Sequence, residues 1–150
     1  AQAISIYQER YHALPGDDRY AELKFQDSNG DPIVINGNGN GKIEESQGEN
    51  GKVWQHLRAA NLIVGSPTSS NEGPINAFSG KTDIGMEQYN ISWIFVRFTR
   101  IPSKIGIIFE ERHDGEIKPR EGRIRAETEN NEELIDNYNS YTHLNLLFVL

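Results

Sequence analysis

The order of periodic segments in this sequence predicts an α+β fold, with an antiparallel sheet covered by helix on one side. An amphipathic helical segment opens the chain, a short helical segment follows a long loop, and two segments with strong β-propensity lie at 90–100 and 143–150. Helices and strands that do not alternate regularly are typical of α+β domains rather than of parallel α/β folds. With 150 residues and no internal repeat or boundary, the sequence predicts a single domain over 1–150.

The first predicted helix spans residues 1–14. Its apolar residues are spaced three, four and three positions apart, which places them on one helical face: Ile4, Tyr7, Tyr11 and Leu14. Pro15-Gly16 then ends the helix. From the pattern alone, this is an amphipathic helix that packs on its own domain.

The middle of the chain is predicted to be mostly loop around one short helix. Residues 16–51 form a long connection with a turn at 27–31. Ser46 and Glu49 have the spacing of a capping box, so a helix is expected to start there and to bury the face with Val53, Trp54, Leu57 and Ala60. Residues 65–85 are rich in Gly, Ser, Pro and Asn and are expected to be a loop.

The second half is predicted to contain the sheet. Residues 90–100 have apolar side chains on both faces, so this strand is expected to be central and well covered. Residues 105–109 are β-branched, but Pro102-Ser103 before them and Gly115 after them favour a helix. Shorter strands are predicted at 123–126 and at 143–150, where alternate residues are apolar.

Composition and motif spacing argue against several functions. The net charge of −7 disfavours nucleic-acid binding, which depends on clusters of Lys and Arg. Cysteine is absent, the four histidines are scattered, and no run of 18 apolar residues occurs. Adjacent carboxylates such as Glu110-Glu111 point different ways on a helix, whereas a hydrolase would need two that face one pocket. The sequence therefore predicts no enzymatic activity.

An Asn-Gly-rich loop is a candidate calcium site. Oxygen-bearing side chains alternate along it and a Gly follows, as in the first half of a calcium-binding loop. The candidate ligands are Asn36, Asn38, Asn40, Lys42, Glu44 and Glu45. Gln47 stands at the position of the usual final carboxylate ligand. The alternative is a series of Asn-Gly turns that holds no ion.

Four segments, in order, resemble the type IV pilin-like proteins, which carry a prepilin-type cleavage and methylation signal. The segments are Tyr7-Gln-Glu-Arg-Tyr-His-Ala-Leu-Pro-Gly-Asp17, Gly37-Asn-Gly-Asn-Gly-Lys-Ile43, Trp54-Gln-His-Leu57 with Ala59-Ala-Asn-Leu-Ile-Val-Gly65, and His113-Asp-Gly115 with Gly122-Arg-Ile-Arg-Ala126. The sequence departs from the family at Asn38, where Asp is common, and in lacking a pilin-type cysteine pair. Residues 127–150 match no part of the family pattern.

The resemblance implies a minor pilin or pseudopilin, a structural subunit of a type IV pilus or a related secretion or DNA-uptake filament. It implies a pilin-like fold in which residues 1–14 are the end of a longer spine helix packed on the sheet. A hydrophobic helix of about 25–30 residues before Ala1 would anchor the chain in the inner membrane, with the domain in the periplasm, and later form the filament core. Ile4, Tyr7, Tyr11 and Leu14 would be the assembly helix face, and Gln8 and Arg10 would contact other subunits.

A different class of function also fits the loops. A secreted adhesin-like or carbohydrate-binding module would use loops 65–85 and 127–142 and would expose aromatic side chains there. Phe78, Tyr138 and Tyr141 are the candidates.

Overall fold

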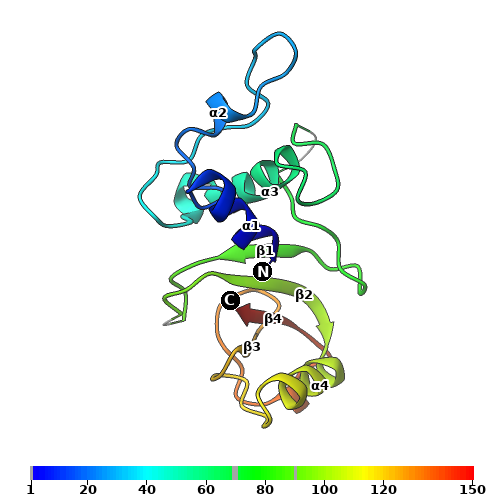
Figure 1. Cartoon of the computed structure of the whole chain (residues 1–150). Helices are drawn as coiled ribbons and strands as arrows, with labels where there is room; N and C mark the ends of the chain where they lie inside the picture. The colour runs from blue at the N-terminus through cyan, green and yellow to red at the C-terminus, as the bar shows by residue number, and fades with distance from the viewer. Residues whose placement is uncertain (1, 69–70, 90) are drawn as a thin grey trace. The chain divides into compact units, whose positions relative to one another are not determined.

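The computed structural model describes residues 2–68, 71–89 and 91–150 and has an α+β fold (Figure 1). Its contacts divide the chain into two compact units, Ala1–Gly73 and Pro74–Leu150. The expectation of a single domain over 1–150 concerns how the two units associate, and it stays a prediction.

The first unit is helical and rich in loops. It contains helix α1 (Gln2–Tyr11), the single turn α2 (Ala21–Lys24), the 3-10 turn η1 (Glu45–Gln47) and helix α3 (Glu49–Ala59). Helix α1 packs on α3. The buried hydrophobic residues of this unit come from both helices and from the long connection between them: Ile4, Tyr7, Ala21, Phe25, Val34, Ile43, Val53, Trp54, Leu57 and Ala60.

Two helix boundaries differ from those that the sequence predicts. Helix α1 ends at Tyr11, because His12 adopts a left-handed conformation with φ of 52°, so Leu14 lies beyond the helix. Helix α3 begins at Glu49, after a left-handed Gly48, and no side chain caps it. The capping box is therefore wrong, because Glu49 turns back to accept the backbone N–H of Glu44 instead.

The second unit is built on a four-stranded antiparallel sheet in the order β1-β2-β4-β3. Its strands are β1 (Thr82–Gly85), β2 (Phe95–Pro102), β3 (Ile124–Glu127) and β4 (His143–Val149). The register between β2 and β4 shifts between Phe98 and Ile101. Such a bulge bends a strand and re-aims its side chains. Strand β2 lies between β1 and β4, so the expectation that the strand at 90–100 is central is confirmed for β2.

Helix α4 (Ser103–His113) packs on the sheet, which confirms the helix predicted around 105–109. One hydrophobic cluster joins this helix, the sheet and the 3-10 turn η2 (Tyr138–Ser140). Its buried members are Ile101, Ile124, Ala126, Ile135, Tyr138, Leu144 and Leu146. A second cluster contains Ile91, Phe95, Leu134 and Leu147. Packing of the N-terminal helix on this sheet depends on how the two units associate, and it remains a proposal.

Two predictions for the sheet are wrong in detail. Strand β2 begins at Phe95 rather than 90, so Trp93 lies on a loop with 70% of its side chain exposed. Asn90 itself lies outside the described residues. Strand β1 occupies the end of the segment 65–85 that was expected to be loop, because Thr82–Gly85 finds a partner in β2 despite its weak apolar pattern.

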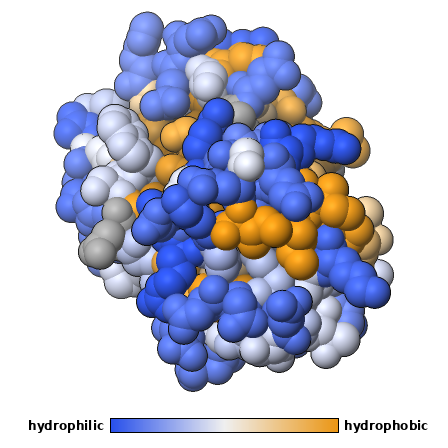
Figure 2. All heavy atoms as spheres, turned by 90° about the horizontal axis from the view of Figure 1, so that it is seen from below, coloured by the Kyte–Doolittle hydropathy of each residue, from blue (hydrophilic) through white to orange (hydrophobic). Residues whose placement is uncertain are grey.

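None of the helices in the described ranges is long and apolar enough to cross a membrane. On the face that Figure 2 presents, hydrophobic side chains gather in patches between hydrophilic ones. Exposed large hydrophobic residues in the second unit are Ile75, Phe78, Trp93, Ile108, Ile117 and Leu150.

Candidate functional site

The expected assembly helix face lies partly on the core of the first unit. Ile4 and Tyr7 are buried, whereas Tyr11 and Leu14 are partly exposed. The rings of Tyr7 and Tyr11 both pack against Phe25, at centroid distances of 6.2 and 5.1 Å. The structure therefore brings most of this face together with residues far along the chain.

The residues expected to face other subunits, Gln8 and Arg10, are exposed on α1. Gln8 also lines an open groove of about 670 Å³ in the first unit, together with Tyr11, Tyr20, Lys24 and others. The two side chains are thus accessible to a partner.

A buried polar cluster fixes α1 to the turn that follows it. The Tyr7 hydroxyl donates to Asp18 Oδ2 at 3.0 Å, and Lys24 Nζ approaches the same oxygen at 2.6 Å. Burial acts to raise the pKa of Asp18, but hydrogen bonds from Lys24, the Tyr20 N–H and Tyr7 outweigh it and hold this pKa below its ordinary value. The carboxylate thus stays charged and anchors both the helix and the turn.

His56 in α3 links this turn to the long connection. Its Nδ1 accepts the N–H of Gly16 at 2.9 Å, so the ring carries its proton on Nε2, which donates to the carbonyl of Ile35 at 2.8 Å. Burial is the main cause that lowers the pKa of His56. Gly16 has φ of 90°, and a Cβ there would lie 2.6 Å from the carbonyl oxygen of Glu49, so glycine is required. Neutral His56 is therefore a structural bridge between three segments.

The Asn-Gly-rich loop wraps around the carboxylate of Asp17. The backbone N–H groups of Gly39, Asn40 and Gly41 donate to its oxygens at 2.7, 3.0 and 2.7 Å. Glu49 holds the same loop by accepting the N–H of Asn38 at 2.9 Å. The loop thus turns its N–H groups inward, toward carboxylates of its own chain.

These contacts leave the candidate calcium ligands poorly placed for an ion. The side-chain oxygens of Asn38 and Asn40 accept N–H groups two residues ahead, and that of Asn36 accepts the N–H of Glu22. The amide groups of Asn38 and Asn40 donate to Glu44, which lowers the pKa of that carboxyl. Lys42 and Glu45 are exposed beside them. The geometry favours the Asn-Gly turn interpretation, and a calcium site here stays a prediction.

The three backbone hydrogen bonds to the Asp17 carboxylate are expected to stabilise the first unit measurably. Asp17→Ala removes the acceptor of three N–H groups, so we expect a loss of about 2 kcal/mol in the free energy of unfolding. Urea unfolding followed by fluorescence of the buried Trp54, in a Trp93→Phe background, measures it. Asp31→Ala is the matched control, because this exposed carboxylate lies at a loop tip, and it should change stability by less than about 0.5 kcal/mol. Equal effects of the two variants would contradict this role of Asp17.

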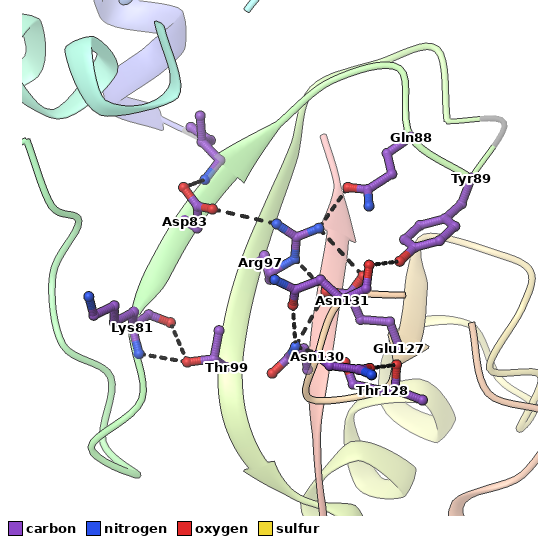
Figure 3. A network of polar contacts seen from close by, with 12 residues as sticks. Lys81, Asp83, Gln88, Tyr89, Arg97, Thr99, Glu127, Thr128, Asn130 and Asn131 are labelled. Atoms are coloured by element: carbon purple, nitrogen blue, oxygen red, sulfur yellow. Dashed lines mark hydrogen bonds and ion pairs between the residues drawn. The ribbon is translucent and has the colours of Figure 1, made fainter. Parts of the chain in front are cut away.

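A second polar cluster lies in the sheet unit and centres on Arg97 of β2 (Figure 3). Its Nε donates to Glu127 of β3, and its Nη2 donates to Gln88 at 2.6 Å. Asp83 of β1 lies 3.5 Å from Nη1. The side chains of Arg97 and Glu127 are 8% and 0% exposed, so they form a buried ion pair between β2 and β3. The more exposed Asp83 extends the cluster to β1.

The same cluster tethers two loops to the sheet. The Tyr89 hydroxyl donates to the carbonyl of Asn131 at 2.8 Å, and Asn145 of β4 donates to the side chain of Asn131 at 2.6 Å (Figure 3). Burial, reinforced by Glu127, raises the pKa of Tyr89. These contacts hold the two loops against the sheet.

The aromatic residues expected to be exposed for carbohydrate binding differ in how exposed they are. Phe78 is 38% exposed and Tyr141 is partly exposed, but Tyr138 is 3% exposed and belongs to the hydrophobic cluster under α4. The exposure expected of Tyr138 is therefore wrong. Trp93, which the sequence placed in a covered strand, is the most exposed aromatic side chain among the large hydrophobics of the described residues.

Searches among protein-family models, curated proteins and solved structures find no match to this chain. Among the described residues, no group of three or more His, Asp or Glu side chains is arranged to hold a metal ion.

Proposed function

We propose that this chain is the periplasm-facing part of a type IV pilin-like structural subunit, a minor pilin or pseudopilin. One observation carries the proposal: three of the segments that resemble the family, separate in sequence, interlock in the first unit. The turn at Gly16-Asp17 receives hydrogen bonds from the Asn-Gly loop and donates one to His56 of the Trp-Gln-His-Leu segment. The segments that resemble the family in sequence are therefore hydrogen-bonded to one another in the first unit.

The mechanism is assembly by packing. A hydrophobic helix preceding α1 would anchor the subunit in the inner membrane and then stack with its neighbours in the filament core. The helix would continue into α1, which ends at Tyr11, and pack on the antiparallel sheet in the pilin manner. The exposed side of α1, with Gln8 and Arg10, would contact adjacent subunits. Such contacts are head-to-tail and generate an open helical filament.

Deletion of the gene in the cells that produce this protein tests the proposal. We expect loss or reduction of filament assembly, protein secretion or DNA uptake, with recovery when the full-length gene is returned. Residues 1–150 alone, exported to the periplasm without an anchor, should not restore the activity. If all three processes continue unchanged in the deletion strain, the proposal fails.

A carbohydrate-binding module is the second candidate, and the exposure of Trp93 favours it. Exposed aromatic rings can stack on sugars because the electron-rich face of the ring attracts the partly positive C–H groups of the sugar. The loop that carries Trp93 is tied to the sheet through Gln88 and Tyr89. A glycan array should show binding that Trp93→Ala abolishes and Phe78→Ala leaves intact. An array without hits would remove this candidate.

A further inference from the structure

Helix α4 carries a buried carboxyl group that makes no hydrogen bond of normal geometry within the described parts of the chain. Glu110 is fully buried, and neither of its carboxyl oxygens has a hydrogen-bond partner with normal geometry among the described residues. The hydroxyl of Tyr138, also buried, is in the same situation. An ionised carboxylate in such a place is costly, because burial removes its hydration and no cation replaces it.

The surroundings of Glu110 offer little to stabilise its charge. The strands beneath α4 contribute apolar side chains to the cluster. Three nearby groups influence the pKa of this carboxyl. The Tyr138 hydroxyl of η2 and the backbone N–H of Lys118 lower it, and Asp114 at the end of α4 raises it. Burial and the negative charge of Asp114 outweigh the other two and raise the pKa of Glu110 to about 7.

Helix α4 and η2 are in close contact one helical turn before Glu110. Gly106 of α4 lies against the Tyr138 ring, where a Cβ would approach a ring carbon to 2.5 Å. Asp114 and Lys118, which both act on Glu110, line an open cavity of about 220 Å³.

We propose that Glu110 is a proton-operated latch that holds α4 against the turn at 138–140 while protonated and loosens this contact when it loses its proton to solvent. The latch closes on acidification and opens above neutral pH. The opened segment belongs to the region 127–142, so pH would regulate the order of that surface. This inference is independent of the filament proposal, since it concerns the second unit alone.

The test uses the 150-residue chain and two variants. Glu110→Gln removes the titration but keeps the shape, and Glu111→Gln is the matched control on the exposed side of the same helix. A raised folded pKa means that the folded state binds the extra proton. The stability that Glu110 contributes is therefore fully present below the unfolded pKa of about 4.3 and is lost as the pH rises to the folded pKa. We expect the folding equilibrium constant of the wild type to fall, relative to Glu110→Gln, by about tenfold per pH unit between pH 5 and 7.

Carboxyl-carbon NMR of the wild type gives a second readout that does not depend on the variant folding. The Glu110 signal should titrate near neutral pH. The protection factor of the Tyr141 amide, whose N–H donates to the Tyr138 carbonyl, should fall over the same range. Glu111→Gln should retain the pH dependence of the wild type. Titration of Glu110 near its ordinary value, or the same pH dependence in Glu110→Gln and the wild type, would overturn the proposal.

Discussion

Replacement of Arg97 by methionine is expected to destabilise the sheet unit by about 3–5 kcal/mol, because it leaves the carboxylate of Glu127 buried without its cation. Gln88 and Asp83 would lose the same partner, so the loop that contains Tyr89 should also loosen. Urea unfolding followed by circular dichroism gives the stability. Faster amide hydrogen exchange at residues 86–89 and 91–94 in the variant than in the wild type would report the loosening of this loop.

Two controls separate the buried charge from the contact itself. The double variant Arg97→Met with Glu127→Leu removes both charges and should cost less than Arg97→Met alone, since an apolar pair can replace a buried ion pair. Lys118→Ala breaks an ion pair with Glu116 in which both side chains are more than half exposed, and it should destabilise the chain far less than Arg97→Met. If Arg97→Met costs as little as Lys118→Ala, the buried pair does not stabilise the sheet.

Replacement of Tyr7 by alanine is expected to cost the first unit about 3–5 kcal/mol, the range for removing a large buried aromatic side chain. The Tyr7 ring is fully buried, stacks on His56 at 6.0 Å and contacts Phe25, and its hydroxyl donates to Asp18. Unfolding is again followed by Trp54 fluorescence in the Trp93→Phe background.

Tyr7→Phe divides this effect into its parts. It keeps the ring and removes one hydrogen bond to a charged acceptor, so we expect a cost of about 1.5–3 kcal/mol. Tyr20→Ala is the exposed control and should stay near 0.5 kcal/mol. In the full-length protein, Tyr7→Ala should also reduce assembly, because Tyr7 joins the helix to the domain. A cost for Tyr7→Ala no greater than that for Tyr20→Ala would contradict this account of the first unit.

The sequence predicted best those elements whose pattern is local. The alternating residues at 143–150 gave strand β4, and Pro102-Ser103 and Gly115 delimited helix α4 closely. Strand β1 was missed because Thr82–Gly85 has little apolar alternation and forms only by pairing with β2. Helix α1 was predicted too long because the left-handed conformation of His12 leaves no trace in the spacing of apolar residues.

The candidate sites depended on contacts between distant residues, which spacing does not encode. Glu49 fits a capping box by its position, yet it binds N–H groups of the Asn-Gly loop because the loop folds back over it. Arg97 and Glu127 are 30 residues apart. The sequence gives one indication of this ion pair, which is Arg97 between the apolar residues Val96 and Phe98. A charged side chain inside a covered strand needs a buried partner.

Cysteine cross-linking in cells tests the central claim, assembly through α1, most directly. The chain has no native cysteine, so single substitutions in the full-length protein give no background from these residues. Gln8→Cys places a thiol on the exposed side of α1, and Asn29→Cys places one on an exposed loop as a matched control. In surface filaments or in the membrane fraction, a short thiol-to-amine cross-linker should join Gln8→Cys to other pilin-like subunits and leave Asn29→Cys largely monomeric. Absence of adducts at both positions, or equal adducts at both, would contradict assembly through this helix.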